Sequence, residues 1–291
     1  RTPGGGLTLA HGVTIVATGG QESRGPDYGL GQHPRIMTQL DLERLIEGGD
    51  PQAQGAREVV MIQCVGPGTE YCSRVCCGQA LGNAIRLKEL NPRMEVSILY
   101  RDIRSYGLKE LQYRQARELG VRFIHYEVSR KPEVSLEAEG LKVKVLDKAL
   151  NREIILNPQR LVLSAGIRPQ GDAEELATRL KLPLTQEKFI MEAHMKLRPL
   201  DLVNEGMYLC GLAHAPKSLE ESITQARGAV SRALTVLSQP YLMVGGIVST
   251  VDQERCAACL TCVRACPYDV PRINENGVAQ IEPSGCQGCG I

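Results

Sequence analysis

The cysteines restrict what this chain can fold into more than any other residue type. Of the eleven, four lie between residues 64 and 77, six lie between residues 256 and 289, and Cys210 stands alone. The start of the sequence, Arg1-Thr2-Pro3, lacks the charged and apolar segments of a secretory signal. Clustered cysteines at C-x2-C spacing then indicate metal binding in a reducing compartment rather than disulfide bonds. We therefore expect two metal-binding regions and a cytoplasmic location.

The C-terminal group has the spacing of an iron–sulfur ligand run. Cys256, Cys259, Cys262 and Cys266 follow one another at C-x2-C-x2-C-x3-C spacing, and Pro267 comes next. Four thiolates must converge on one small [4Fe–4S] cube, and tightly turned backbone at this spacing brings three of them together. The fourth cysteine, before proline, points towards the other cluster in a two-cluster ferredoxin. The run predicts a ferredoxin-like α+β domain, with zinc or free thiols as the alternative.

A second run of the same kind begins at Cys286 and continues with Cys289. The next cysteine of this run is expected at the position where the sequence ends, so each cluster has three thiolates from this chain. We therefore expect a piece of a longer protein, cut within the motif. The six cysteines divide into two ligand sets, Cys256, Cys259 and Cys262 for one cluster and Cys266, Cys286 and Cys289 for the other.

The overall composition is that of an ordinary globular protein, with 43% hydrophobic and 23% charged residues. The net charge of +1 gives no sign of a nucleic-acid or anionic membrane partner. No apolar run approaches the roughly 20 residues that a membrane span needs. We therefore expect no nucleic-acid binding and no membrane insertion, and a length of 291 residues allows one large domain or two to three smaller ones.

Hydrophobic periodicity predicts strands and helices that alternate along most of the chain. A β-α-β-α-β order indicates a parallel sheet with helices on both faces, which is a doubly wound α/β fold. The expected strands are 13–18, 58–62, 96–100, 121–124 and 206–211, and the expected helices are 38–46, 73–90, 109–119 and 219–237. Extended hairpin segments are expected over 132–166 and a linker over 239–250.

The earlier group of cysteines lies where a buried strand meets a helix. In a Rossmann domain this junction binds the pyrophosphate of a dinucleotide through Gly-x-Gly-x-x-Gly and the helix N-terminus. Here Tyr71 takes the third glycine position after Gly66 and Gly68. The helix dipole also favours an anionic thiolate-bound cluster, so we expect a cluster in place of the pyrophosphate. Cysteines packed as small hydrophobic residues are the alternative. The cysteines concerned are Cys64, Cys72, Cys76 and Cys77.

The stretch Tyr71-Cys72-Ser73-Arg74-Val75-Cys76-Cys77 is the most specific of several that match one family. The others are residues 15–20, 63–66, 99–107, 163–169, 192–194, 197–199 and 222–229. Together they resemble the A subunit of heterodisulfide reductase, a flavoprotein iron–sulfur subunit of anaerobic archaea and bacteria. The likeness covers essentially the whole chain, and it implies a thioredoxin-reductase-like core ahead of the ferredoxin-like domain.

The resemblance implies FAD in the core and a [4Fe–4S] cluster on the four earlier cysteines. The family's Gly-x-Gly-x-x-Gly loop for the ADP half of FAD is absent, as if the chain begins after it. The implied domains are an FAD-binding domain (1–50 and 171–240), an inserted nucleotide-binding-like domain that carries the cluster (51–170), and a truncated ferredoxin-like domain (241–291).

A flavin site is expected where Gly211 precedes a helix that starts with a capping box, because close backbone approach and helix amides suit a flavin carbonyl or phosphate. Lys217 supplies a positive charge beside a reduced anionic flavin, unless it is an ordinary surface lysine. The resemblance places Gln225 and Ala226 at the isoalloxazine ring. The full expected set is Ala17, Thr18, Gly19, Gly166, Gly211, Leu212, Lys217, Ser218, Gln225 and Ala226.

The leading functional hypothesis is an oxidoreductase subunit that passes electrons between FAD, clusters and partner subunits. The resemblance implies the other subunits of a heterodisulfide-reductase-type complex as partners, with a hydrogenase or dehydrogenase and ferredoxin, and it allows a homodimer. One alternative is an NAD(P)H-dependent flavin disulfide reductase, although no redox C-x-x-C lies in the flavin core. Another is a non-catalytic electron-wiring subunit without flavin.

Overall fold

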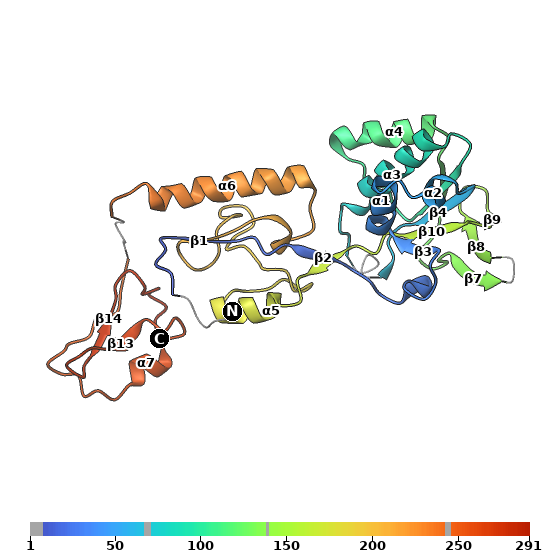
Figure 1. Ribbon diagram of the computed structural model, residues 1–291. Coiled ribbons are helices and arrows are strands. Elements are labelled where there is room, and N and C mark those ends of the chain that lie inside the picture. Colours follow the sequence, from blue (N-terminus) through green and yellow to red (C-terminus); the bar gives the residue numbers. More distant parts are fainter. Residues whose placement is uncertain (1–7, 67–70, 138–139, 242–245) are drawn as a thin grey trace.

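A computed structural model describes residues 8–66, 71–137, 140–241 and 246–291 (Figure 1). The predictions on the first residues of the chain and on Gly68 lie outside these ranges. No helix in the described part of the chain is long and apolar enough to cross a membrane. Figure 1 shows three regions in a row, with the cysteine-rich C-terminal residues at one end and a parallel sheet with its helices at the other.

The central element of the largest region is a five-stranded parallel sheet with the order β3-β10-β4-β5-β6. Its strands are β3 (Ile36–Thr38), β10 (Arg160–Leu163), β4 (Glu58–Ile62), β5 (Glu95–Tyr100) and β6 (Arg122–His125). Parallel strands are buried on both faces, so they consist of near-continuous apolar runs. Four of the five residues of β4 are buried, which agrees with this rule.

Helices cover one face of this sheet and an antiparallel sheet covers the other. The helices are α1 (Gln39–Glu47), α2 (Pro51–Gln54), α3 (Cys76–Leu90) and α4 (Glu110–Glu118), and the antiparallel strands are β7 (Glu133–Glu137), β8 (Gly140–Asp147) and β9 (Arg152–Leu156). Val59 and Met61 of β4 pack with the helices, whereas Val60 and Ile62 pack with Leu141 to Leu156 of the antiparallel sheet. Within the described residues this corrects the prediction of helices on both faces, because a hairpin pattern supplies the second layer.

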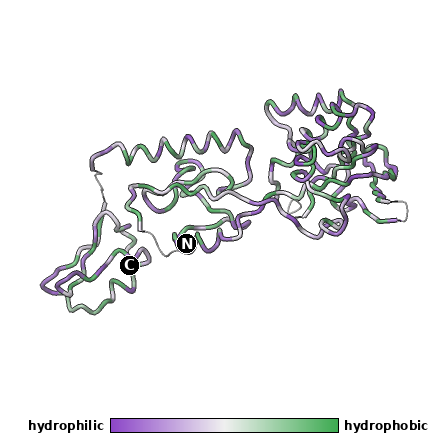
Figure 2. Tube along the Cα trace, in the orientation of Figure 1, coloured by the Kyte–Doolittle hydropathy of each residue, from purple (hydrophilic) through white to green (hydrophobic). Residues whose placement is uncertain are grey.

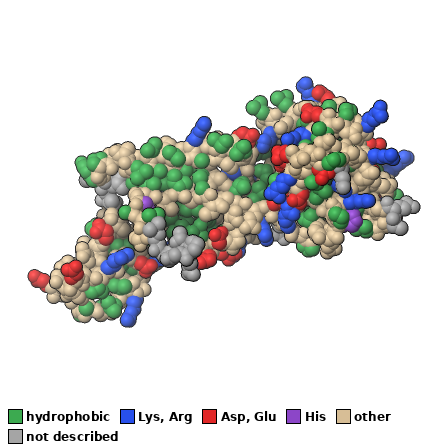
Figure 3. All heavy atoms as spheres, viewed as in Figure 1, with side chains coloured by type: hydrophobic (Ala, Val, Ile, Leu, Met, Phe, Trp, Pro, Cys, Tyr) green, Lys and Arg blue, Asp and Glu red, His purple; other side chains and the backbone are tan. Residues whose placement is uncertain are grey.

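The middle region is built around two short parallel strands, β1 (Thr14–Val16) and β12 (Met207–Leu209). The long helix α6 (Leu219–Leu237) packs on β12 through Ala229 and Ala233. Hydrophobic and hydrophilic residues alternate along α6 (Figure 2), and hydrophobic side chains gather on its visible face (Figure 3). Helix α5 (Ala173–Leu180) and the 3-10 turn η4 (Gly211–Ala213) complete this region.

Two chain crossings connect the middle region to the sheet region. The outgoing strand β2 (Gly20–Glu22) and the returning strand β11 (Ile167–Pro169) pair antiparallel, so both crossings lie in one ribbon (Figure 1). The outgoing chain then passes through the 3-10 turn η1 (Asp27–Gly29) to β3. Strand β3 and helix α1 precede the domain boundary predicted at residue 50, yet they pack within the sheet region because β3 pairs with β10.

The C-terminal region contains little regular structure. It has the short helix α7 (Thr261–Ala265) and the antiparallel pair β13 (Pro271–Ile273) and β14 (Ala279–Ile281). In residues 246–291 only Pro271 and Ala279 are buried. Two buried residues do not form a hydrophobic core, so this region needs another source of stability.

Several element boundaries follow the sequence signals, and one does not. The helix N-termini expected at Thr38 and Ser218 have capping boxes in the structure, in which Asp41 and Glu221 are the third residues of their helices. Helix α3 instead begins at Cys76, three positions after the predicted start at Ser73. The delay has a local cause, because Arg74 adopts a left-handed conformation (φ 60°) that interrupts the helix. The remaining 3-10 turn, η3 (Gly107–Lys109), leads into α4.

Replacing Leu99 by alanine is expected to destabilise the sheet region by about 2–5 kcal/mol. Leu99 lies in β5, is fully buried, and packs between the parallel and antiparallel sheets. Urea denaturation measures the change in the free energy of unfolding. The matched control is Leu111→Ala, since Leu111 on α4 is 61% exposed and should change stability by less than about 0.5 kcal/mol. Equal effects of the two changes would contradict this description of the core.

Candidate functional site

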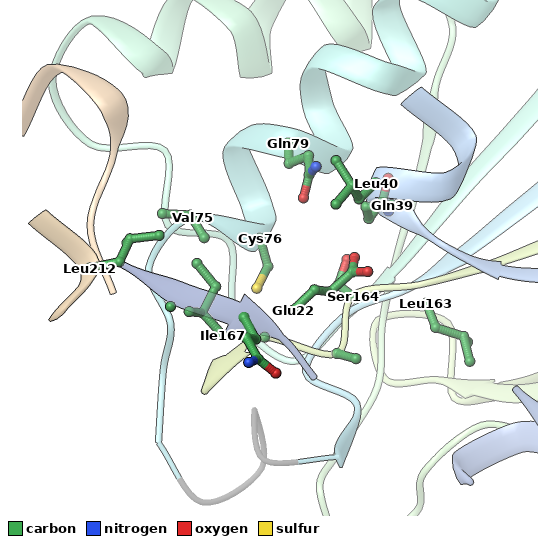
Figure 4. A pocket seen from close by; sticks show the side chains of 14 residues that line it. Glu22, Gln39, Leu40, Val75, Cys76, Gln79, Leu163, Ser164, Ile167 and Leu212 are labelled. Atoms are coloured by element: carbon green, nitrogen blue, oxygen red, sulfur yellow. The ribbon is translucent and has the colours of Figure 1, made fainter. Parts of the chain in front are cut away.

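A cavity of about 230 Å³ lies at the carboxyl edge of the parallel sheet, where the sheet region meets the middle region (Figure 4). In open α/β sheets this edge is where ligands bind. The lining comes from the ribbon, the starts of α1 and α3, the segment after β10, and the turn after β12. Its residues are Gly20, Gln21, Glu22, Gln39, Leu40, Val75, Cys76, Gln79, Leu163, Ser164, Ala165, Gly166, Ile167 and Leu212.

Three of the residues predicted as cofactor ligands meet in this cavity. Cys76 belongs to the earlier cysteine group, and Gly166 and Leu212 belong to the expected flavin set. They are up to 136 positions apart in sequence (212 − 76 = 136), and the crossing of the ribbon brings them together. The structure thus places a predicted cluster ligand and predicted flavin-binding residues on the walls of one cavity, which we call the shared cavity.

The four earlier cysteines lie around the start of α3. Cys64 follows β4 in a left-handed conformation (φ 59°), and Cys76 and Cys77 are the first two residues of α3. The backbone N–H of Arg74 donates a hydrogen bond to the sulfur of Cys72 (3.3 Å). The sulfur of Cys77 lies 3.7 Å from the carbonyl oxygen of Asp102, to which its thiol donates.

The electrostatics of this group suit a cationic iron centre. Burial raises the pKa of Cys76 to about 12, and the neighbouring thiols of Cys77, Cys64 and Cys72 act in the same direction. Burial likewise raises the pKa of Cys77 to about 11 and raises the pKa of Cys64. The buried thiols of Cys64, Cys76 and Cys77 become thiolates when iron compensates their charge.

The four donors are all cysteine thiols, which is the donor type of an iron–sulfur cluster. Among the described residues, no three His, Cys, Asp or Glu side chains converge as one metal ion requires. In a [4Fe–4S] cube each thiolate binds a different iron, so the four sulfurs need not meet at one point. The residues present therefore fit the cluster that the sequence predicts at this junction.

The C-terminal cysteines surround a second cavity, of about 220 Å³. Cys262, Cys266, Cys286 and Cys289 all line it. Backbone N–H groups donate to two sulfurs of this region, from Ser249 to Cys286 (3.4 Å) and from Ala279 to Cys256 (3.3 Å). Hydrogen bonds from Ser249 and Gly288 lower the pKa of Cys286, and those from Thr261 lower the pKa of Cys259. Amide donors around thiolates are typical of iron–sulfur sites.

The expected flavin residues gather at the carboxyl ends of β1 and β12. The two strands are parallel, so Ala17, Thr18 and Gly19 after β1 lie at the same edge as Gly211 and Leu212 after β12. Gly19 and Gly211 both have positive φ (82° and 70°), which favours glycine. A Cβ on Gly211 would meet no atom within 4 Å, so the backbone there is open to a ligand.

Lys217 and Gln225 both point to Gly211. The ammonium of Lys217 donates to the carbonyl oxygens of Gly211 (2.7 Å) and Ala215 (2.9 Å), and the N–H of Gly211 donates to Oε1 of Gln225 (2.8 Å). Ser218 caps α6 directly after Lys217, and Ala226 follows Gln225 on the same helix. Lys217 is half-buried and has partners, so it is not the ordinary surface lysine of the alternative interpretation.

Sequence reasoning missed the polar groups that support this site. The imidazole of His214 contacts Glu192 (2.8 Å) and the amide of Gln225 (2.8 Å), which fixes the position of the Gln225 side chain. Gln39 and Ser164 line the shared cavity without having been singled out. Their only signal in the sequence is position, since Ser164 lies in the matching stretch 163–169 and Gln39 lies at the start of the predicted helix 38–46.

Lys217 gives the site a pH dependence whose sign can be measured. Burial lowers the pKa of Lys217 from 10.5 to about 8. Between these two pH values the folded protein binds fewer protons than the unfolded chain, so the contribution of Lys217 to stability rises with pH across this window. We expect the urea midpoint of the native chain to rise relative to Lys217→Met from pH 8 to pH 10. An exposed-lysine variant, Lys131→Met, corrects for the loss of one charge, and a difference that falls with pH would contradict the assignment.

One family model matches part of the C-terminal region. Residues 249–272 match the family model of the 4Fe-4S binding domain, and the match contains Cys256, Cys259, Cys262 and Cys266. The prediction of [4Fe–4S] binding by the C-terminal region is thereby confirmed, while its individual ligands stay predictions.

Curated relatives match almost the whole chain. The A subunit of the H(2):CoB-CoM heterodisulfide,ferredoxin reductase of Methanothermobacter marburgensis is 33% identical over 292 residues, which is 92% of this chain and 43% of the relative. The iron-sulfur A subunit of the CoB--CoM heterodisulfide reductase of Methanocaldococcus jannaschii is 35% identical over 297 residues, 94% of this chain and 45% of the relative. The chain is a relative of the heterodisulfide reductase A subunit. It spans less than half of the length of these relatives.

Solved structures confirm the fold. The thioredoxin reductase of T. acidophilum is similar with a TM-score of 0.51 at 14% identity, covering 78% of this chain and 66% of that one. The L-lysine 6-monooxygenase of Pseudomonas syringae is similar with a TM-score of 0.50 at 13% identity, covering 77% and 63%. The thioredoxin-reductase-like α/β core predicted for this relative of heterodisulfide reductase is therefore correct.

Proposed function

We propose that this chain is the electron-transfer part of a heterodisulfide-reductase-type oxidoreductase, with FAD and [4Fe–4S] clusters as cofactors. The observation that carries the proposal is the cavity lined by Cys76, Gly166 and Leu212. A cluster on the earlier cysteines and a flavin at the turn after β12 would then be neighbours. When bound, a flavin exchanges electrons in pairs or singly, and each [4Fe–4S] cluster carries single electrons.

The residues around the flavin position have separate roles in this proposal. Gly19, Gly166 and Gly211 allow close backbone approach, because each has a positive φ. Lys217 holds a positive charge beside the Gly211 turn, which would stabilise a reduced, anionic flavin. The remaining members of the set border the same edge, and they are Ala17, Thr18, Leu212, Ser218, Gln225 and Ala226.

The three cluster positions have ligand sets that stay proposals. We propose the earlier cluster on Cys64, Cys72, Cys76 and Cys77, and two C-terminal clusters that share Cys256, Cys259, Cys262, Cys266, Cys286 and Cys289. A cavity lined by four of the C-terminal cysteines supports the two C-terminal cluster positions. We also propose the domain division expected from the sequence, with β3 and α1 added to the cluster-carrying inserted domain, since they pack in its sheet.

Anaerobic reconstitution of the chain with iron, sulfide and FAD tests the proposed function. We expect both chemical iron and bound flavin absorbance. A protein without iron would remove the electron-transfer role, and a protein with iron but without flavin would leave an electron-wiring part alone. Titration with NADH should leave the chain's flavin oxidised, because Tyr71 interrupts the dinucleotide loop. Reduction by NADH would favour a pyridine-nucleotide-dependent disulfide reductase instead.

The curated relatives are named as one subunit of larger complexes, so other subunits exist for them. We propose such subunits as partners of this chain, with ferredoxin and a hydrogenase or dehydrogenase among them. The name of the M. marburgensis relative contains H(2) and ferredoxin, which supports this choice. We propose a homodimer as a further assembly step. A cytoplasmic location is supported by the eleven cysteines, which form no disulfide bonds among the described residues.

A further inference from the structure

Two buried polar side-chain atoms on the wall of the shared cavity, Nε2 of Gln39 and the hydroxyl oxygen of Ser164, have no hydrogen-bond partner within the described residues. Gln39 is 1% exposed, and its Oε1 accepts a hydrogen bond from Asn83 (2.9 Å), which leaves its Nε2 unpaired. Ser164 is 3% exposed, and its hydroxyl is unpaired. Both residues line the cavity at the edge between β3 and β10 (Figure 4). Buried polar groups are rarely left unpaired in folded proteins, so a ligand is expected to complete these two.

The backbone N–H and carbonyl groups of Ser164 are both hydrogen-bonded, so only its hydroxyl lacks a partner within the described residues. The N–H of Ser164 donates to the carbonyl oxygen of Ile62 (2.9 Å), and its own carbonyl oxygen accepts from the N–H of Val65 (3.1 Å). Ser164 thus continues the pairing of β10 with β4, which fixes the direction of its side chain. The hydroxyl has no part in holding the sheet together.

The rest of the lining indicates what fills the cavity. It includes Gly20, Gly166 and Leu212, at the edge where the flavin is proposed. A Cβ on Gly20 would come within 3.0 Å of Ile167 and 3.3 Å of Leu212, so the ribbon and the turn are already in close contact there. A flat ring held by the turn after β12 would share this cavity with Gln39 and Ser164.

A nicotinamide dinucleotide is a poorer fit for this cavity than a flavin. Its pyrophosphate would bind to the loop that carries the cysteines, where Tyr71 occupies the third glycine position of the Gly-x-Gly-x-x-Gly motif. The Tyr71 hydroxyl donates to the carbonyl oxygen of Ile167, and its ring packs edge-on against Phe189 with 6.4 Å between centroids. The tyrosine is thereby fixed between the ribbon and the middle region.

We propose that Gln39 and Ser164 of the sheet region hydrogen-bond the polar edge of the flavin ring system. That edge offers a carbonyl, an N–H and a second carbonyl. The Gln39 amide and the Ser164 hydroxyl each donate to a carbonyl oxygen, and Glu22 in the same lining accepts from the N–H. Glu22 already accepts from the Thr38 hydroxyl (2.8 Å) and pairs with Arg24 (3.1 Å), and a carboxylate has lone pairs for a further donor. The inference rests on the proposed flavin site and adds that the cluster-carrying region helps to bind the flavin.

The substitution Ser164→Ala tests this inference through two readouts of opposite sign. Without FAD, the variant should melt at the same temperature as the native chain or higher, because it loses an unpaired buried hydroxyl. With FAD, the variant should bind roughly two- to tenfold more weakly, because one hydrogen bond is lost. Thermal unfolding of the FAD-free chain and quenching of FAD fluorescence measure the two effects.

Ser97→Ala is the matched control. Ser97 is also fully buried in the same sheet, but its hydroxyl accepts a hydrogen bond from Nε of Arg122 (3.0 Å). This variant should melt lower without FAD and bind FAD with native affinity. Native FAD affinity of Ser164→Ala, or a loss of stability equal to that of Ser97→Ala, would overturn the inference while leaving the flavin site standing. A native chain that takes up no FAD would overturn the proposed flavin function as well.

Discussion

Removal of iron from the chain is expected to unfold residues 246–291 and to leave the two larger regions folded. The C-terminal region has one five-residue helix and two three-residue strands, and only Pro271 and Ala279 are buried among its residues. Regions this small rarely fold without metal or disulfides, and binding free energy of the metal is then folding free energy. The clusters should therefore serve as the core of this region.

Hydrogen–deuterium exchange with and without a strong iron chelator measures this effect. Backbone amides of β13, β14 and α7 should lose protection after chelation, by several orders of magnitude if the region unfolds fully. Amides of β4 and β5 are the internal control, since their protection comes from a hydrophobic core. Full protection of β13 and β14 in the iron-free chain would show that the region is stable without its clusters.

The substitution Cys76→Ser is expected to remove about four iron atoms per chain. Cys76 is the first residue of α3 and lines the shared cavity, and a serine hydroxyl stays protonated and is a poor ligand for iron. The signals of the C-terminal clusters should remain in the electron paramagnetic resonance spectrum of the reduced chain. Chemical iron analysis after anaerobic reconstitution gives the count.

Cys210→Ser is the control for the loss of a thiol. Cys210 is also buried, but it packs with Tyr208, Ala229 and Ala233 at the end of β12, as a core thiol. Its replacement should cost some stability and no iron. Iron content that is native in Cys76→Ser, or that falls equally in Cys210→Ser, would refute the proposed ligand set of the earlier cluster.

Much of the fold is readable from local signals in the sequence. Strand β4 matches its predicted bounds because a buried parallel strand is a continuous apolar run with clear ends. Helix α6 matches residues 219–237 because Ser218 and Glu221 form its capping box. In both elements the decisive interactions lie within a few positions of one another, so the sequence window contains them.

The parts that could not be read depend on contacts between distant residues. The hairpin pattern of 132–166 predicts extended segments, but it does not reveal that β8 covers one sheet face while β10 enters the sheet between β3 and β4. Gln39 and Ser164 are 125 positions apart (164 − 39 = 125), and although Ser164 lies in a matching stretch, nothing in the sequence links it to Gln39, so their meeting depends on that insertion. The cysteine spacings, by contrast, identify metal binding without any knowledge of the fold.

The antiparallel ribbon of β2 and β11 connects the two halves of the proposed cofactor site. Cys76 lies in the sheet region and Leu212 in the middle region. Besides the ring contact of Tyr71 with Phe189, three side-chain contacts between charged or hydroxyl groups bridge the halves within the described residues. These are Arg74 with Glu221 (2.6 Å), Tyr106 with Glu221 (3.4 Å) and Lys109 with Glu220 (4.0 Å). Exposed pairs of this kind contribute about 0–1 kcal/mol each, so they can break and re-form at little cost. A twist of the ribbon would lengthen the distance between the proposed flavin and the proposed cluster on the earlier cysteines. This two-stranded hinge would thereby lower the rate of electron transfer between them.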